Sequence, residues 1–187
     1  MRTLILIDFS NLNGVYRSLG KRVLPTGIVK VLSSRYLSAA RTQSLRVSRE
    51  DREVIDAIVY AATPSSQPDG IQRWHDHLRH TGINVMTKVA RVGEHGEQRC
   101  NFDVEMAVDA MRLLSRNILD EIILVTHDGD FSYLLDEARR NGIHTVVAGH
   151  EERISKDLKT SAHEVVNFDL GDRSCFEDRP TEEESVI

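Results

Sequence analysis

The chain has only two cysteines among its 187 residues, Cys100 and Cys175. They lie far apart and lack the C-x-x-C spacing of many zinc sites, so we expect neither a disulfide framework nor a zinc centre. The sequence also lacks any run of eighteen apolar residues, and near its start no basic segment precedes a long apolar stretch and a cleavage site. We therefore expect a cytoplasmic protein with no membrane association.

The excess of negative charge is small, with a formal net charge of −5. Most of it lies at the C-terminal end, because residues 171–187 contain six acidic and only two basic residues. The remaining body is close to neutral, so basic clusters can dominate the field over one face and a nucleic-acid partner is not excluded. We predict one folded domain over residues 1–170 and an acidic, flexible tail over residues 171–187, since the tail has little apolar content.

Short apolar runs alternate with segments of helical periodicity along the domain. The runs lie at residues 4–8, 54–61, 83–89, 121–125 and 143–148, with a sixth candidate at 164–168. The helical segments lie at residues 27–41, with Thr26 as the N-cap, and at 68–80, 103–115 and 130–140. Strands that alternate with helices favour right-handed crossovers and a parallel sheet. We therefore predict an α/β fold of three layers, αβα, around a mainly parallel sheet of five or six strands.

Aspartates stand where two of the predicted strands end. Asp8 closes the first run and Asp128 follows the fourth. Because the carboxyl ends of parallel strands form the ligand-binding edge of such a sheet, we expect both side chains to face one crevice. Two unit charges about 4 Å apart repel by roughly 4 kcal/mol at an effective dielectric near 20, and a shared cation is the usual remedy. Asp103, at the start of a predicted helix, and Asp130 complete the group, although each of the four taken alone is also compatible with a helix cap or a turn.

Four segments of the chain resemble the motifs of NYN domains, which are PIN-like proteins, and in particular those of the LabA-like bacterial group. The segments are I-D-F-S-N-L at residues 7–12, N-F-D-V-E-M-A-V-D-A-M at 101–111, V-T-H-D-G-D-F at 125–131 and G-I-H-T-V-V at 142–147. The resemblance implies a Rossmann-like sheet with strand order 3-2-1-4-5 and a ribonuclease site that depends on Mg²⁺ or Mn²⁺. Related sequences often have Lys and Gly before the middle aspartate, where this chain has Cys100, Asn101 and Phe102.

The resemblance also implies roles for the acidic residues. Asp8, Asp103 and Asp128 match the metal-binding acids of the family, and Asp130 is a supporting catalytic residue. Hard oxygen ligands of this kind suit Mg²⁺ or Mn²⁺, which can activate a water for attack on a phosphodiester. Under this interpretation Asp8 is the central ligand and Asp130 orients a water. The substrate would be RNA, most simply single-stranded, and the interpretation leaves room for a homo-oligomer.

Residues near the aspartates are candidates for substrate binding. Asn11 can bind a water or a phosphate, or it can cap the helix after the first strand. Ser10 and His127 are each adjacent to the acidic motifs, and His127 is the histidine we expect to touch substrate. Arg17 and Arg99 flank the crevice in sequence and can hold a phosphate backbone, or they can be ordinary solvated charges.

Two other functions share features with this pattern. Phosphatases of the haloacid dehalogenase type also place an Asp after the first strand, but they need a second Asp two residues later, where this chain has Ser10. The stronger alternative is a catalytically weak or inactive module that binds RNA or a protein through the same cleft. Metal-dependent cleavage of RNA distinguishes it from the enzyme.

Overall fold

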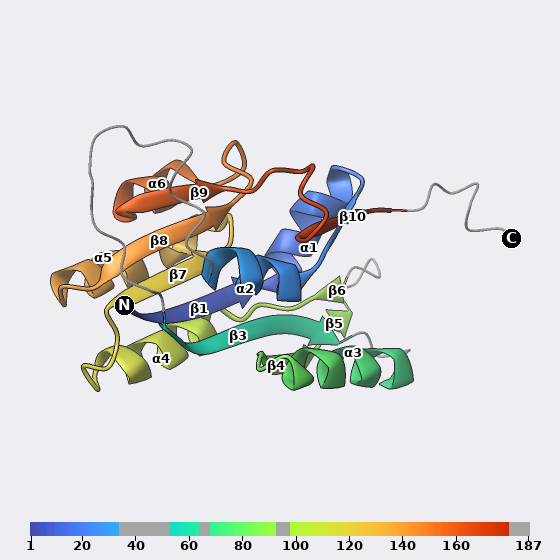
Figure 1. Ribbon diagram of the computed structural model, residues 1–187, viewed down its shortest axis with the longest axis horizontal. Coiled ribbons are helices and arrows are strands. Elements are labelled where there is room, and N and C mark those ends of the chain that lie inside the picture. The colour runs from blue at the N-terminus through green and yellow to red at the C-terminus, as the bar shows by residue number, and fades with distance from the viewer. Residues whose placement is uncertain (34–52, 64–67, 93–97, 180–187) are drawn as a thin grey trace, which may run out of the picture.

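The computed structural model describes residues 1–33, 53–63, 68–92 and 98–179 (Figure 1). Its centre is a sheet of six strands that all run parallel, in the order β4-β3-β1-β7-β8-β9. The strands are β1 (Arg2–Asp8), β3 (Glu53–Thr63), β4 (Asn84–Val89), β7 (Glu121–Val125), β8 (His144–Gly149) and β9 (Glu164–Asn167). Counted along the chain, this is the order 3-2-1-4-5-6, so the predicted sheet is confirmed.

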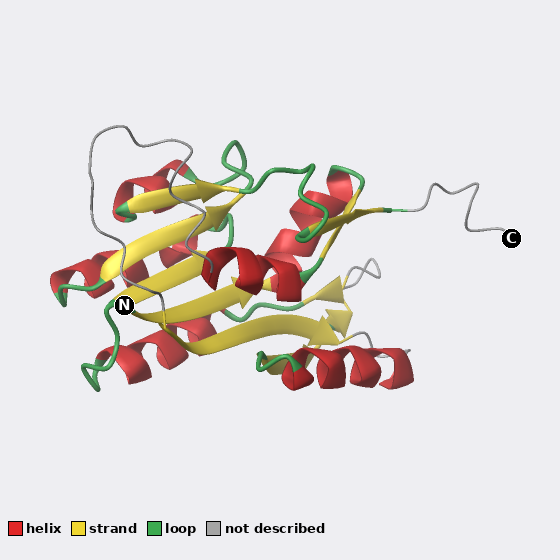
Figure 2. Ribbon diagram, in the orientation of Figure 1, coloured by secondary structure: helices red, strands yellow, loops and turns green. Residues whose placement is uncertain are grey.

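Helices cover both faces of this sheet and give the molecule its three layers (Figure 2). They are α1 (Phe9–Ser18), α2 (Pro25–Ser33), α3 (Pro68–His80), α4 (Asp103–Leu114), α5 (Ser132–Arg140) and α6 (Lys156–Ser161), with a short 3-10 helix η2 (Gly129–Phe131) before α5. No helix in the described part of the chain is both long and apolar enough to cross a membrane.

Strand β1 divides the core in two, because alternate side chains of a strand point to opposite faces. Leu4 and Leu6 pack with residues of α4, α5 and α6, whereas Ile5 and Ile7 pack with residues of α1, α2 and α3. All four side chains are completely buried. A strand that is apolar on both faces can only sit in the middle of a covered sheet, and this places Asp8 at the centre of the carboxyl edge.

Two predicted helices have different boundaries in the structure. The helix predicted at residues 27–41 begins at Pro25, because proline suits the first helical position, and Thr26 therefore lies inside it instead of capping it. Residues 34–41 of that prediction lie outside the described residues. The helix predicted at 130–140 consists of η2 followed by α5, since the side chain of Asp128 caps a tight 3-10 turn first.

The end of the described chain folds back onto the domain. Strand β10 (Phe176–Asp178) pairs antiparallel with the short strand β2 (Lys21–Val23), and the ring of Phe176 stacks on Tyr16 of α1 at 4.5 Å between centroids. Cys175 and Phe176 are almost fully buried. The prediction of a flexible tail from residue 171 is therefore wrong for residues 171–179. The buried side chains of Cys175 and Phe176 and the pairing of β10 with the edge of β2 hold this segment against the domain. Residues 180–187 lie outside the described residues.

Gly27 marks how closely this segment approaches α2. A Cβ atom at Gly27 would lie 1.6 Å from the backbone oxygen of Ser174, whereas one at Gly14, on α1, would meet nothing within 4 Å. We expect Gly27→Ala to destabilise the protein by about 1–3 kcal/mol, because the segment must move away. Gly14→Ala should be neutral or stabilising by up to about 1 kcal/mol, because alanine favours a helix. Urea unfolding of both variants measures this, and equal stabilities would contradict the tight docking of residues 171–179.

Candidate active site

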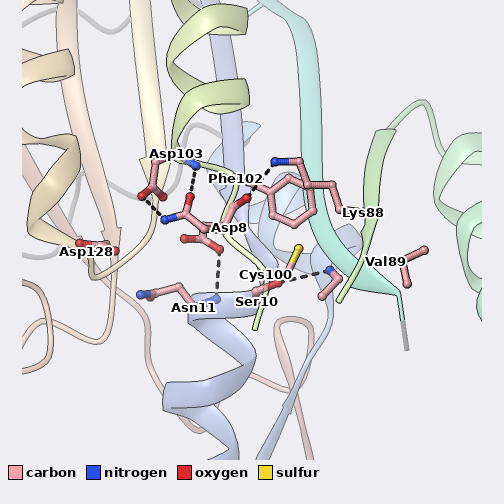
Figure 3. A pocket seen from close by; sticks show the side chains of 11 residues that line it. Asp8, Ser10, Asn11, Lys88, Val89, Cys100, Phe102, Asp103 and Asp128 are labelled. Carbon is pink, nitrogen blue, oxygen red and sulfur yellow. Dashed lines mark hydrogen bonds between the residues drawn. The ribbon is translucent and has the colours of Figure 1, made fainter. Parts of the chain in front are cut away.

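A pocket of about 930 Å³ lies at the carboxyl edge of β1, β3 and β4, beside the first residues of α1 and α4 (Figure 3). Its lining consists of Asp8, Ser10, Asn11, Ala62, Lys88, Val89, Cys100, Asn101, Phe102, Asp103 and Asp128. Three of the predicted acidic residues thus line one pocket. For Asp8 and Asp128, which follow strands, this is the common crevice that the strand pattern predicts. Figure 3 shows them on one side, with Lys88, Phe102 and Val89 on the other.

The close acidic group that the described residues form differs from the predicted set of metal ligands. Asp103, Asp128 and Asp130 each offer a carboxylate oxygen, and these oxygens lie within 4.8 Å of one another. Asp130, predicted as a supporting residue, belongs to this group, whereas Asp8 lies outside it in the same pocket. Among the described side chains, no Lys or Arg forms an ion pair with any of the three. Within the described residues, the group is therefore partly exposed negative charge without a counter-ion.

Local hydrogen bonds hold two of the three carboxylates in place, those of Asp128 and Asp103. Asp128 accepts a hydrogen bond from the backbone N–H of Asp130 at 3.1 Å and so caps η2. Asn101 forms a local turn just before α4, because its Oδ1 accepts from the backbone N–H of Asp103 at 2.7 Å while its amide donates to the carboxylate of Asp103. The same aspartate can therefore take part in a local cap or turn and also face the pocket. For this reason the sequence alone left both roles open for each residue. Sequence reasoning missed this role of Asn101, although an Asn side chain that bonds the backbone two residues on is a common turn signal.

Asp8 is the buried member of the pocket, with 8% of its surface exposed. Its Oδ1 accepts a hydrogen bond from the backbone N–H of Asn11 at 3.0 Å, and its Oδ2 accepts from the hydroxyl of Thr126 at 3.4 Å. Burial raises the pKa of Asp8 to about 6, and the negative charges of Asp103 and Asp128 add to this rise. The hydroxyl oxygen of Thr126 also accepts from the backbone N–H of Asp128 at 3.3 Å, so this residue connects two of the aspartates.

His127 does not line the pocket, which differs from its predicted contact with substrate. Only 6% of its surface is exposed, and both ring nitrogens have partners inside the protein. Nε2 accepts from the backbone N–H of His150 at 3.0 Å, and Nδ1 lies 2.8 Å from Oδ1 of Asn11. Burial lowers the pKa of His127 to about 4, helped by the charges of His150 and Arg153. The imidazole is therefore neutral at physiological pH.

The other predicted substrate-binding residues differ in their position relative to the pocket. Ser10 lines the pocket, and its hydroxyl oxygen accepts from the backbone N–H of Ala62 at 3.3 Å. Arg17 is exposed near the end of α1, and eight residues of helix span about 12 Å, so it stands away from the pocket. Arg99 belongs to the short strand β6 (Gln98–Arg99), which pairs with β5 (Arg91–Val92), but its side chain lies outside the described structure.

Lys88 is the one basic residue among the described side chains that line the pocket. Its ammonium group pairs with Glu105, donates to the backbone oxygen of Asn101 at 3.0 Å and lies 5.2 Å from the centre of the Phe102 ring. These contacts hold the segment before α4 against β4. About 42% of the Lys88 side chain stays exposed, so a positive charge faces the pocket opposite the aspartates.

The fold and its acidic pocket agree with comparisons to known proteins. A model of the NYN domain matches residues 2–169. The chain belongs to the NYN domain family. It is 24% identical over 158 residues to the low amplitude and bright protein LabA of Synechococcus elongatus, a match that covers 81% of this chain and 82% of LabA. The resemblance inferred from the four motifs is thereby confirmed.

Two further similar proteins give no information on activity. The protein MJ0482 of Methanocaldococcus jannaschii is 39% identical over 66 residues, which is 35% of this chain and 28% of that protein. The crystal structure of VPA0982, a protein of unknown function from Vibrio parahaemolyticus, superposes with a TM-score of 0.69 and 24% identity over 94% of this chain and 96% of that chain. This second likeness supports the fold alone.

Membership of the family bears on the acidic group. NYN domains are PIN-like nuclease domains, which usually use divalent metals, and a group of three carboxylates lies at the edge of the pocket. Carboxylate oxygens are the donors that hard divalent cations prefer, and the three partly exposed acids in this NYN domain have no described counter-ion. The donor set therefore fits a divalent metal, and family and site together indicate a nuclease-type function.

The raised pKa of Asp8 predicts a particular pH dependence of stability in the metal-free NYN domain. Between the ordinary value of 3.8 and about 6, folded Asp8 keeps a proton that the unfolded chain has released, so its contribution to stability falls as pH rises through this window. Asn cannot titrate. We expect Asp8→Asn to gain about 1–3 kcal/mol of unfolding free energy relative to wild type between about pH 4 and pH 7.

The measurement is urea unfolding of both proteins in the presence of a chelator at several pH values. His127 acts in the opposite direction, because its lowered pKa gives stability that is lost as pH falls toward about 4. Since both proteins contain His127, its contribution cancels in their difference. A difference that does not change with pH would contradict the raised pKa of Asp8.

Proposed function

We propose that this NYN domain is a Mg²⁺- or Mn²⁺-dependent endoribonuclease that hydrolyses phosphodiester bonds of single-stranded RNA. The observation that supports it most is the group of Asp103, Asp128 and Asp130, whose oxygens lie within 4.8 Å of one another at the edge of an open pocket. Bringing three carboxylates so close opposes folding unless a cation offsets their repulsion. A purely structural set of helix caps has no need for this convergence.

The three carboxylates would hold the metal, directly or through waters. When bound, a divalent metal would polarise a phosphate oxygen and lower the pKa of a water. The protein supplies the remaining contributions with its own side chains. Lys88, on the opposite wall, offers a positive charge to a second phosphate of the strand, and Ser10 offers its hydroxyl hydrogen at the pocket floor.

Asp8 is suited to receive a proton from the attacking water. It is buried, held at one oxygen by Asn11 and at the other by Thr126, and its pKa of about 6 lies close to neutral pH. A general base works best when its pKa is near the working pH, because it is then both ionised and basic enough. In this proposal Asp8 accepts the proton at a carboxylate oxygen that faces the pocket, beside the three carboxylates that would hold the metal. Asp8 then acts as the general base, and not as the central metal ligand expected from the sequence.

A circular, labelled single-stranded RNA provides the decisive assay, because an exonuclease cannot open it. We expect wild-type protein to linearise it with Mn²⁺ or Mg²⁺ and not with a chelator. Asp103→Asn and Asp128→Asn should each lower the rate about a hundredfold or more, since the loss of one charge misplaces the metal. Asp157→Asn, which changes an exposed aspartate at the start of α6, serves as the matched control and should be unaffected.

Inactive wild-type protein, or equal rates in all three Asn variants, would contradict the proposal. A circular DNA of the same sequence tests the sugar preference. RNA that binds in the pocket and stays uncut in the presence of metal would favour the alternative, a regulatory module that uses the same cleft.

Thermal melts test the metal site without any substrate. A cation that binds only the native state raises stability by RT ln(1 + [L]/Kd), which is about 2.7 kcal/mol at a hundredfold excess over Kd. We expect millimolar Mn²⁺ to raise the Tm of the wild type. Asp128→Asn should raise the Tm in chelator, by relieving repulsion, and reduce the further rise with Mn²⁺. Identical melts of the wild type with and without Mn²⁺ would refute a metal site in this pocket.

A further inference from the structure

The side chain of Asn11 has a fixed orientation at the edge of the pocket. Its Oδ1 accepts two hydrogen bonds from His127, one from the backbone N–H at 3.0 Å and one from the ring Nδ1 at 2.8 Å. A carboxamide oxygen has two lone pairs, so both are occupied. The amino group, Nδ2, has no partner among the described residues and is the part of Asn11 that remains for the pocket (Figure 3).

The ring of His127 can act as a donor because its other nitrogen is an acceptor. The backbone N–H of His150 donates to Nε2 at 3.0 Å, so Nε2 has no proton and Nδ1 has one. The ring sits against Gly149, where a Cβ atom would lie 2.9 Å from Nε2 and 3.1 Å from Cδ2. Its neighbours therefore determine both the tautomer and the position of the imidazole.

The orientation matters because the pocket is rich in acceptors. Asp8, Asp103 and Asp128 line it, and a phosphodiester brings more negative oxygens. An Asn11 side chain turned by 180° would present its carbonyl oxygen to these groups and repel them. Held as it is, Asn11 presents two N–H donors, which are groups that bind a phosphate oxygen.

We infer that His127 is a positioning residue, which holds the carboxamide of Asn11 so that its amino group donates to a phosphate oxygen of the bound strand. This inference rests on the proposed function for the identity of the ligand, and on hydrogen bonds within the chain for the positioning itself. It gives His127, which is buried behind the pocket, a role in catalysis through Asn11 and not through contact with substrate.

A matched pair of variants separates the effect of the hydrogen-bond donor at His127 from the effect of its side-chain volume. His127→Asn keeps an amide N–H near the place of Nδ1, whereas His127→Leu has a similar size and no donor. We expect His127→Leu to lower kcat/KM for RNA cleavage about three- to tenfold, as for the loss of one hydrogen bond, and His127→Asn to recover most of that loss. In an Asn11→Ala background the two replacements should have equal rates, because nothing is left to position.

Gly149→Ala provides an independent way to displace the ring without changing His127 or the pocket lining. It should reproduce the loss seen in His127→Leu. His163→Leu is the control, because the ring of His163 is also held by a backbone hydrogen bond, with Nδ1 accepting from the N–H of Thr145 at 3.1 Å, and it does not line the pocket. Its kcat/KM should equal that of the wild type.

Nuclear magnetic resonance of the Asn11 side-chain NH₂ group gives a readout that needs neither metal nor RNA. The group should be rigid in wild type and in His127→Asn, and mobile in His127→Leu and Gly149→Ala. An equally rigid NH₂ group in His127→Leu, or an unchanged kcat/KM in that variant of an active enzyme, would overturn the inference. If the wild-type protein does not cleave RNA, the proposed function fails, and the NH₂ measurement still decides whether His127 positions Asn11.

Discussion

The pairing of β1 with β3 on one side and β7 on the other is the constraint on which the site depends. Because both pairings are parallel, Asp8 lies beside Tyr60, and the residue that follows Val125 lies beside Asp8. That residue is Thr126, whose hydroxyl reaches the carboxylate of Asp8. A shift of one residue in either register would turn Asp8 from the face that it shares with Leu4 and Leu6, where α4 packs, to the opposite face, since neighbouring strand residues point to opposite faces.

The electrostatics of the pocket follow from this placement. The aspartates come from three separate places in the chain. Among the described residues, Asp8, Asp103 and Asp128 are held by hydrogen bonds from neutral donors and not by a basic side chain. Asp8 has Asn11 and Thr126, and Asp128 has the backbone of Asp130. Asp109 shows the contrast, because it is on the same helix as Asp103 but accepts from the hydroxyl of Tyr60 and pairs with Arg112. Neutral donors fix a carboxylate in position and leave its charge available to a ligand.

The apolar runs allowed the parallel sheet and the approach of Asp8 and Asp128 to be predicted, because buried parallel strands have a strong apolar signature and their ends share one edge. The strand order and the full set of acids, with Asp103, came from the resemblance to NYN domains. Interactions between distant residues could not be read in the same way. His127 looked like a substrate contact because it precedes Asp128, and only the backbone of His150, 23 residues later, shows that its ring is occupied. The burial of Phe176 could not be predicted either, because the apolar pair Cys175–Phe176 in an acidic segment does not indicate that the segment pairs with β2.

The β2–β10 pairing has a consequence for how the domain is delimited. The family match ends at residue 169, yet Phe176 lies beyond it and stacks on Tyr16, whose ring is 5.9 Å from that of His127 between centroids. A fragment cut at the family boundary would uncover the aromatic face of α1 and remove the layer behind the histidine. The shortest piece of this chain that keeps the pocket fully supported therefore extends about ten residues past the matched domain, to the end of β10.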